Sequence, residues 1–360
     1  MNRSFLLPLV AAMAAMVPAC ARLTPPPPNI SVHHAESFGQ IEVLDPRLNA
    51  LLAPGTPLEK LASGFDWSEG PVWIKPGKAP VSFGPASIRA GGYLLFSDVP
   101  SNTVYRWSPA DGVSVFIKPS GYTGSTPRGG EPGSNGLTVD SEGRLVLCEH
   151  GDRRVGRIEK NGQHIALADR FMGKRFNSPN DVVFKSNGDL YFTDPPYGLE
   201  KNVDDPEKEI SYQGVYRLKP NGEVTLLTDQ ITRPNGLAFA PDEKTLYVAC
   251  SDPRVAVWMA YDVKADGTLA NGRVFFDATP MVSPQNPGLP DGLKVDARGN
   301  LWATGPGGVL IFSPDGKYLG TIRTGEATAN CAWGDDGSTL YITADMFLCR
   351  VRTQVKGAGW

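Results

Sequence analysis

Short apolar segments recur along the chain, and each begins with a polar side chain where a buried strand is expected to start. The segment Leu137–Asp140 follows such a residue, and after a turn at Glu142-Gly143 a second apolar segment begins. The pattern occurs six times, with the opening residues Glu69, Asn135, Asn180, Asn235, Asp291 and Asn330. Short strands that repeat every ~40–55 residues are typical of propeller blades. The pattern therefore predicts six blades.

The predicted fold is an all-β, six-bladed β-propeller over residues 58–352, followed by a tail at 353–360. Each blade is expected to have four strands, but the last one has only three before the chain ends, at Cys331–Trp333, Leu340–Ala344 and Phe347–Val351. We expect Leu58–Ala62 to supply the fourth strand of this blade. Pairing of the two chain ends closes the ring without leaving a broken edge.

The N-terminus has the features of a signal peptide, which we place at residues 1–21. An apolar stretch, Phe5–Val17, precedes the small-residue cleavage site Ala19-Cys20-Ala21. The stretch is too short to span a bilayer, so no transmembrane helix is expected in the mature chain. The sequence predicts export to the periplasm or the exterior. Cys20 also fits a lipoprotein signal, so a lipid anchor and simple secretion are both open. Residues 22–57 are interpreted as a Pro-rich spacer and N-terminal extension.

Charge and cysteine content exclude some classes of protein. The 35 Lys and Arg residues are interspersed with 38 Asp and Glu residues, for a net charge of −3, so no nucleic-acid footprint is expected. The absence of a Cys-x-x-Cys motif excludes a zinc knuckle and a dithiol redox motif. Small buried hydrophobes and disulfides both fit the propeller's cysteines, which are Cys148, Cys250, Cys331 and Cys349.

Four of the opening residues form a candidate metal site, because inner strands of a propeller all begin at one end of its channel. These four are Glu69, Asn180, Asn235 and Asp291. Two carboxylates and two amide carbonyls are hard oxygen ligands, which match Ca²⁺. Zn²⁺, Mg²⁺ and Mn²⁺ are alternatives, although zinc usually takes imidazole or thiolate ligands. Asn-Gly and Asp-Gly pairs also make turns before strands, which is the simpler explanation at any single blade.

Further side chains fall on the face where the inner strands begin, and they are candidate substrate contacts. They are Asn135, His150 and Tyr197. Each has a simpler alternative, because Asn135 fits a turn, His150 fits a hydrogen-bonded loop position, and Tyr197 follows a rigid Asp-Pro-Pro turn. Long loops on a rigid scaffold usually carry binding residues, so this face is the expected functional face.

Five phrases together resemble the gluconolactonase, regucalcin and luciferin-regenerating-enzyme family in its bacterial long form. They are Ser68–Trp73, Arg175–Val183, Tyr191–Gly198, Arg233–Phe239 and Pro290–Asp296. The resemblance covers about residues 58–352 and implies a six-bladed propeller with one divalent metal, usually calcium. It further implies that Glu69, Asn235 and Asp291 bind the metal, that Asn180 is a ligand or a substrate contact, and that Arg175 binds substrate.

The reaction implied by the resemblance is hydrolysis of a small-molecule sugar lactone. Bound Ca²⁺ would polarise the lactone carbonyl. Asp291 would act as base for the attacking water, or would attack the carbonyl itself. A hydrolase of another ester or a phosphotriester at the same site is an alternative, and so is a non-catalytic propeller that only binds. A serine esterase is not expected, because the chain has no Gly-x-Ser-x-Gly elbow.

Overall fold

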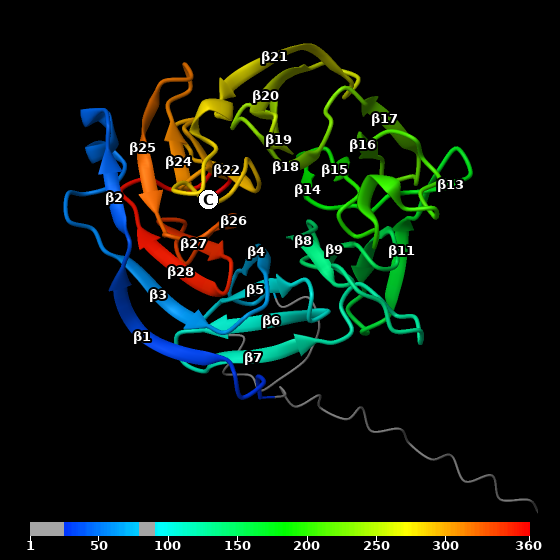
Figure 1. Ribbon diagram of the computed structural model, residues 1–360, viewed down its shortest axis with the longest axis horizontal. Helices are drawn as coiled ribbons and strands as arrows, with labels where there is room; N and C mark the ends of the chain where they lie inside the picture. Colours follow the sequence, from blue (N-terminus) through cyan, green and yellow to red (C-terminus); the bar gives the residue numbers. More distant parts are fainter. Residues whose placement is uncertain (1–24, 79–90) are drawn as a thin grey trace, which may run out of the picture.

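The computed structural model describes residues 25–78 and 91–360, and it is a six-bladed β-propeller built almost entirely of strands (Figure 1). The predicted signal peptide and Cys20 lie outside the described residues. Six antiparallel sheets surround a common axis, and the first strand of each blade lies nearest that axis (Figure 1). No helix among the described residues is long and apolar enough to cross a membrane.

The strands of the first three blades follow one another along the chain. Blade 1 contains β4 (Ser68–Ile74), β5 (Tyr93–Asp98), β6 (Thr103–Ser108) and β7 (Gly112–Ile117). Blade 2 contains β8 (Ser134–Val139), β9 (Leu145–Glu149), β10 (Arg154–Ile158) and β11 (His164–Ala168). Blade 3 contains β14 (Val182–Phe184), β15 (Leu190–Asp194), β16 (Gly214–Leu218) and β17 (Val224–Thr228). Between blades 2 and 3 lies a short hairpin of β12 (Arg170–Phe171) and β13 (Lys174–Arg175).

The last three blades continue the ring. Blade 4 contains β18 (Pro234–Phe239), β19 (Thr245–Asp252), β20 (Val255–Val263) and β21 (Leu269–Asp277). Blade 5 contains β22 (Leu293–Val295), β23 (Leu301–Gly305), β24 (Gly308–Phe312) and β25 (Tyr318–Arg323). Blade 6 contains β26 (Thr328–Gly334), β27 (Thr339–Ala344) and β28 (Phe347–Arg352). Three 3₁₀ turns are also described, η1 (Pro46–Ala50), η3 (Asn202–Asp204) and η4 (Thr279–Met281).

An N-terminal strand completes blade 6, as the sequence predicts. Strand β3 (Leu58–Ser63) pairs antiparallel with β28, with Leu58 opposite Val351 and Ser63 opposite Phe347. The preceding extension contributes more than a spacer. Strand β1 (Ser31–Phe38) adds to β3, and β2 (Gln40–Val43) adds to β25, so blades 5 and 6 have five strands each. Strand β1 could not be predicted from hydrophobic periodicity, because its sequence is largely polar.

Neighbouring blades meet through close contacts between their inner strands. Strands β4, β8, β14, β18, β22 and β26 each pack against the inner strands of both neighbouring blades. Glycine follows most of the opening residues because the next blade leaves no room for a side chain. A Cβ atom at Gly70 would lie 2.0 Å from the carbonyl oxygen of Asn135, and one at Gly136 would lie 2.7 Å from that of Asn180. The same crowding occurs at Gly236 and Gly292.

Large aromatic side chains fill the space between blades. Trp73 of blade 1 stacks on Tyr341 of blade 6 with ring centroids 5.3 Å apart, and Trp302 of blade 5 meets Trp333 of blade 6 edge-on at 5.2 Å. Such pairs stabilise an interface beyond the area they bury. The cysteines of the propeller are free and buried, at Cys148, Cys250, Cys331 and Cys349. They pack as small apolar side chains.

The closure of the ring by β3 predicts that substitutions in this strand lower the free energy of unfolding. Leu61 of β3 is 2% exposed and packs with Trp73 and Leu348 at the junction of blades 1 and 6. Leu61→Ala is expected to lower the free energy of unfolding by about 2–5 kcal/mol, because it leaves a cavity in this core. The matched control is Val32→Ala in β1, where the side chain is 47% exposed. Urea unfolding of both variants tests the prediction, and equal effects would contradict it.

Candidate functional site

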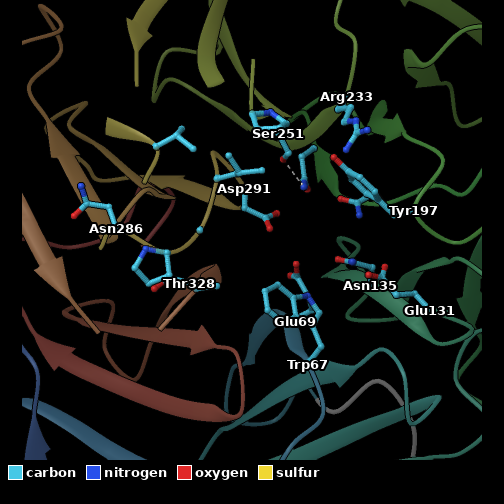
Figure 2. Close-up of a pocket in the computed structure, with 18 of the residues that line it drawn as sticks. Trp67, Glu69, Glu131, Asn135, Tyr197, Arg233, Ser251, Asn286, Asp291 and Thr328 are labelled. Carbon is cyan, nitrogen blue, oxygen red and sulfur yellow. Dashed lines mark hydrogen bonds between the residues drawn. The ribbon is translucent and has the colours of Figure 1, made fainter. Parts of the chain in front are cut away.

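A pocket opens where the inner strands begin, and it has a volume of about 440 Å³. Figure 2 shows side chains from several blades pointing into it, with the carboxylates of Glu69 and Asp291 facing each other near its centre. Six of the residues predicted from the sequence line the pocket, namely Glu69, Asn135, Asn180, Tyr197, Asn235 and Asp291. The structure therefore brings together all four candidate metal ligands and two of the candidate substrate contacts.

The local backbone explains why these side chains converge. Glu69, Asn135 and Asn235 are each the second residue of an inner strand, while Asn180 and Asp291 come two residues before one. Backbone hydrogen bonds hold the openings of neighbouring blades together. Gly136 N donates to Asn180 O at 2.7 Å, and Gly292 N donates to Ala329 O at 2.8 Å. The opening residues are thereby fixed around one axis.

Contacts of the side-chain nitrogen atoms orient two amide side chains in the pocket, those of Asn180 and Asn235. Asn235 Nδ2 donates to Ser251 Oγ at 2.8 Å, and Asn180 Nδ2 lies 3.3 Å from His150 Nε2. This leaves the carbonyl oxygens of both amides for another partner. Among the described residues, the buried Oδ1 atoms of Asn135, Asn180 and Asp291 have no hydrogen-bond partner. Buried polar atoms are nearly always paired, so these oxygens indicate a missing donor or cation.

The charge of the pocket also fits a cation. Burial, together with the negative charges of Asp181 and Glu131, raises the pKa of Glu69 to about 8. Burial, together with the charge of Glu69, raises the pKa of Asp291 well above its ordinary value. Two buried carboxylates that face each other are costly unless a positive charge lies between them. The two carboxylates and the amide oxygens suit a hard divalent cation such as Ca²⁺.

Carboxylates alone do not make up the candidate site. Within residues 25–78 and 91–360, no three His, Cys, Asp or Glu side chains gather in the manner of a metal centre. A cation in this pocket would therefore use Asn180 and Asn235 oxygens in addition to Glu69 and Asp291. Hard oxygen ligands of this kind, including amide carbonyls, are usual for calcium.

His150 lies behind the pocket and contacts one of the candidate ligands. Its side chain is fully buried between Asn180, 3.3 Å from Nε2, and Glu131, whose Oε2 lies 3.3 Å from Nδ1. His150 is not among the residues that line the pocket, whereas Glu131 is. The structure thus places His150 where it supports the Asn180 amide.

Arg175 lies apart from the central pocket. It belongs to the β12–β13 hairpin, where its backbone N–H donates to Glu209 Oε2 at 2.8 Å and its Nη2 donates to Asp152 O at 3.3 Å. It lines a second cavity of about 660 Å³ together with Arg128 and Arg153. The arginine that lines the central pocket is Arg233, just before β18 (Figure 2).

Sequence reasoning missed several residues that line the pocket. Trp67, Glu131, Arg233 and Ser251 are among them, with an apolar wall from Val282, Pro287 and Leu289. Some signal was present, because Glu131 lies in a long loop that enters blade 2 and Arg233 lies next to a predicted ligand. The sequence pattern could not show which loop residues turn inward, since loops have no regular spacing.

A ring of six blades with an oxygen-rich pocket at one end of its channel is the architecture that fold and site define. Residues 67–345 match the family model described as SMP-30/Gluconolactonase/LRE-like region. The chain belongs to this family. It is 41% identical over 331 residues to a gluconolactonase of Zymomonas mobilis, an alignment that covers 90% of this chain and 89% of the relative.

Solved structures agree with this assignment. A gluconolactonase from Xanthomonas campestris is similar with a TM-score of 0.70 and 32% identity, over 94% of this chain and 99% of that one. A regucalcin from Agrobacterium tumefaciens, described as a calcium-binding protein, has a TM-score of 0.61 over 81% of this chain and 92% of that one. At 20% identity, the regucalcin likeness shows the fold alone.

The buried carboxylates predict a pH effect on the metal-free protein. Because the pKa of Glu69 is about 8 when folded and its ordinary value is 4.5, the folded state binds an extra proton between these pH values. The contribution of Glu69 to stability therefore falls as pH rises from 4.5 to 8. In the presence of chelator, Glu69→Gln should make the protein more stable at pH 8.5, by on the order of 2–4 kcal/mol, and change little at pH 4.

Urea unfolding of metal-free wild type and Glu69→Gln at both pH values measures this effect. Glu142→Gln, whose side chain is 58% exposed, is the control and should follow the wild type. If wild type and Glu69→Gln lost stability in parallel as the pH rose, the buried carboxylate would not be responsible.

Proposed function

We propose that this protein hydrolyses a sugar lactone in a calcium-dependent reaction. The observation that carries the proposal is the pair of pocket carboxylates, the buried Glu69 and the partly buried Asp291, which face each other beside unpartnered amide oxygens (Figure 2). Membership of the family and 41% identity to a gluconolactonase support the reaction class. The two carboxylates and the amide oxygens are hard ligands of the kind that calcium takes, which supports the choice of metal. Glucono-1,5-lactone is the first substrate to test.

The residues of the chain have separate tasks in this proposal. Glu69, Asn180, Asn235 and Asp291 hold the calcium ion, which supplies a Lewis acid for an ester carbonyl when it is bound. Asp291 Oδ1 has no hydrogen-bond partner and reaches the pocket, so it can accept a proton from water that attacks the carbonyl carbon. Direct attack by Asp291 is the alternative: it would break the lactone C–O bond and form a mixed anhydride with the carboxylate. Water that cleaves this anhydride at the Asp291 carbonyl would leave solvent oxygen in the carboxylate after a single turnover in labelled water.

The pocket also suits a small polyol ring. Asn135, Glu131 and Arg233 offer hydrogen-bonding groups on one side of the pocket (Figure 2). Val282, Pro287 and Leu289 add apolar lining. A cyclic sugar derivative has hydroxyl groups at its edge and an apolar face. Ligand pockets usually combine an apolar lining with a few placed polar groups, as here.

Residues 1–21 lead us to propose that the protein is exported to the periplasm or the exterior. The apolar stretch and the small-residue cleavage site support this. Mass spectrometry of the mature N-terminus distinguishes the two forms, since a diacylglyceryl group on Cys20 means a lipid anchor and an unmodified end means simple secretion. Retention of Met1 in the mature protein would contradict export.

Hydrolysis is tested by following acid release from glucono-1,5-lactone above its spontaneous rate. Glu69→Gln and Asp291→Asn are expected to lower kcat/KM at least about 10²-fold, because each removes a charge that holds the ion or activates water. Chelator should have the same effect on the wild type, and added calcium should reverse it. Asp189→Asn, at a buried turn on the opposite side of blade 3, is the control and should keep its activity.

The outcomes separate the competing functions. Absence of turnover in the wild type, with calcium still raising the unfolding temperature, would keep the metal site and move the search to other esters and phosphotriesters. Full activity of both site variants would contradict the proposed chemistry. Absence of any calcium effect and of any turnover would leave a propeller that only binds.

Substitution of Arg233 is expected to weaken substrate binding, whereas substitution of Arg175 is not. Arg233 lines the pocket beside Tyr197, whereas Arg175 lies on a separate cavity, 3.3 Å from Asp152 O. Arg233→Ala is expected to raise KM for the lactone by about 10-fold through loss of a charged hydrogen-bond donor. Arg175→Ala should leave KM within about twofold of the wild type, since its contacts lie outside the pocket. A larger effect of Arg175→Ala would restore the role that the family resemblance implies.

A further inference from the structure

The pocket contains four polar atoms without a hydrogen-bond partner among the described residues, and they are of two kinds. Three of them are the Oδ1 atoms of Asn135, Asn180 and Asp291, which accept hydrogen bonds or bind a cation when Asp291 is ionised. The fourth is the hydroxyl of Tyr197, which can also accept but carries a proton that it can donate. A cation satisfies the three acceptors but repels the hydrogen of the phenol. The Tyr197 hydroxyl therefore needs a second kind of partner, an acceptor atom next to the cation.

Among the described residues, no side chain completes a hydrogen bond with this hydroxyl. Ser251 Oγ lies near enough to Tyr197 to lower its pKa, but it already donates to Pro290 O and accepts from Asn235 Nδ2 at 2.8 Å. Arg233, which lies next to Tyr197 in Figure 2, is itself a donor. Burial, and to a smaller extent the charge of Asp291, raises the pKa of Tyr197. A phenol with even an ordinary pKa keeps its proton at neutral pH.

We propose that Tyr197 is a catalytic residue that donates a hydrogen bond from its hydroxyl to an oxygen of the reacting ester group of the lactone. The inference rests on the proposed function and adds a role that calcium and Asp291 do not fill. The phenol keeps its proton throughout. Its hydrogen bond becomes stronger as negative charge develops on the ester oxygen, and a donor already fixed at that position does not have to reorganise.

Hydrogen bonds to a neighbouring loop fix the position of the loop that carries Tyr197. The residue follows Asp194-Pro-Pro in the loop between β15 and β16, and Asp194 is held by Asn177 N and Ser178 N at 2.8 Å each. The carbonyl of Pro195 accepts a hydrogen bond from Ser178 Oγ at 2.6 Å. The loop that carries Tyr197 is thus fastened to the loop that carries Asn180. A hydrogen-bond donor and a candidate metal ligand are held at a constant separation.

The test compares two tyrosines. Tyr197→Phe removes only the hydroxyl that points into the pocket. Tyr216→Phe is the matched control, because its buried hydroxyl also lacks a hydrogen-bond partner but lies in blade 3 among Phe176 and Phe192, outside the pocket. Both variants and the wild type are assayed with glucono-1,5-lactone and calcium. The unfolding midpoint is measured with and without calcium, and binding of the unreactive glucono-1,5-lactam is measured by calorimetry.

We expect Tyr197→Phe to lower kcat/KM on the order of 10²-fold, mainly through kcat. Lactam affinity should fall by only about 2- to 10-fold, as for one neutral hydrogen bond. The calcium-dependent shift of the unfolding midpoint should be unchanged, and Tyr216→Phe should retain wild-type activity.

Wild-type kcat/KM in Tyr197→Phe would overturn the inference while leaving the proposed function intact. A loss of stability without a loss of kcat would also overturn it, because the hydroxyl would then serve packing. If the wild type neither hydrolyses the lactone nor binds the lactam, the proposed function fails and the inference fails with it.

Discussion

The whole arrangement depends on how closely the inner strands approach one another at one end of the channel. Glycines after the opening residues let the backbone of one blade touch the opening residue of the next, with no room for a Cβ at Gly70 or Gly136. Backbone hydrogen bonds such as Gly136 N to Asn180 O then fix this contact. A wider ring would leave the opening side chains too far apart to share a ligand. Blade packing and site geometry are therefore one constraint, and ring closure by β3 maintains it.

Bringing the Glu69 and Asp291 carboxylates together has an electrostatic cost, and this cost determines what the pocket can bind. Burial raises the pKa of both Glu69 and Asp291, the charge of Glu69 raises that of Asp291 as well, and the nearby Asp181 and Glu131 add to the effect on both. Proteins rarely keep such groups unpaired, so this arrangement favours a positive charge in the pocket. The amide oxygens of Asn180 and Asn235 have the same preference, because neighbouring groups already engage their nitrogen atoms. Among the unpartnered pocket atoms of the described residues, the Tyr197 hydroxyl is the one that we propose to donate, and it would mark the place of a substrate oxygen rather than of a cation.

Much of this could be predicted from the sequence, because repetition is visible without coordinates. The six opening residues predicted six blades, and the incomplete last blade predicted closure by Leu58–Ala62, which the structure confirms. Side chains at strand openings were predictable because strands impose their position. Loop residues such as Glu131 and Arg233 were not, and Arg175 lies outside the pocket because a two-stranded hairpin carries it away. Strands β1 and β2 were missed because their polar sequences pair with edges that only the folded ring provides.

A crystal structure grown with calcium tests the central claim most directly. The claim is that Glu69, Asn180, Asn235 and Asp291 form one cation site at the channel mouth. The predicted result is a single ion in the pocket with oxygens of these residues at about 2.3–2.6 Å and further oxygens from water or ligand. A pocket that holds only water at millimolar calcium, or an ion bound elsewhere while the Glu69 and Asp291 carboxylates hydrogen-bond to each other, would contradict it.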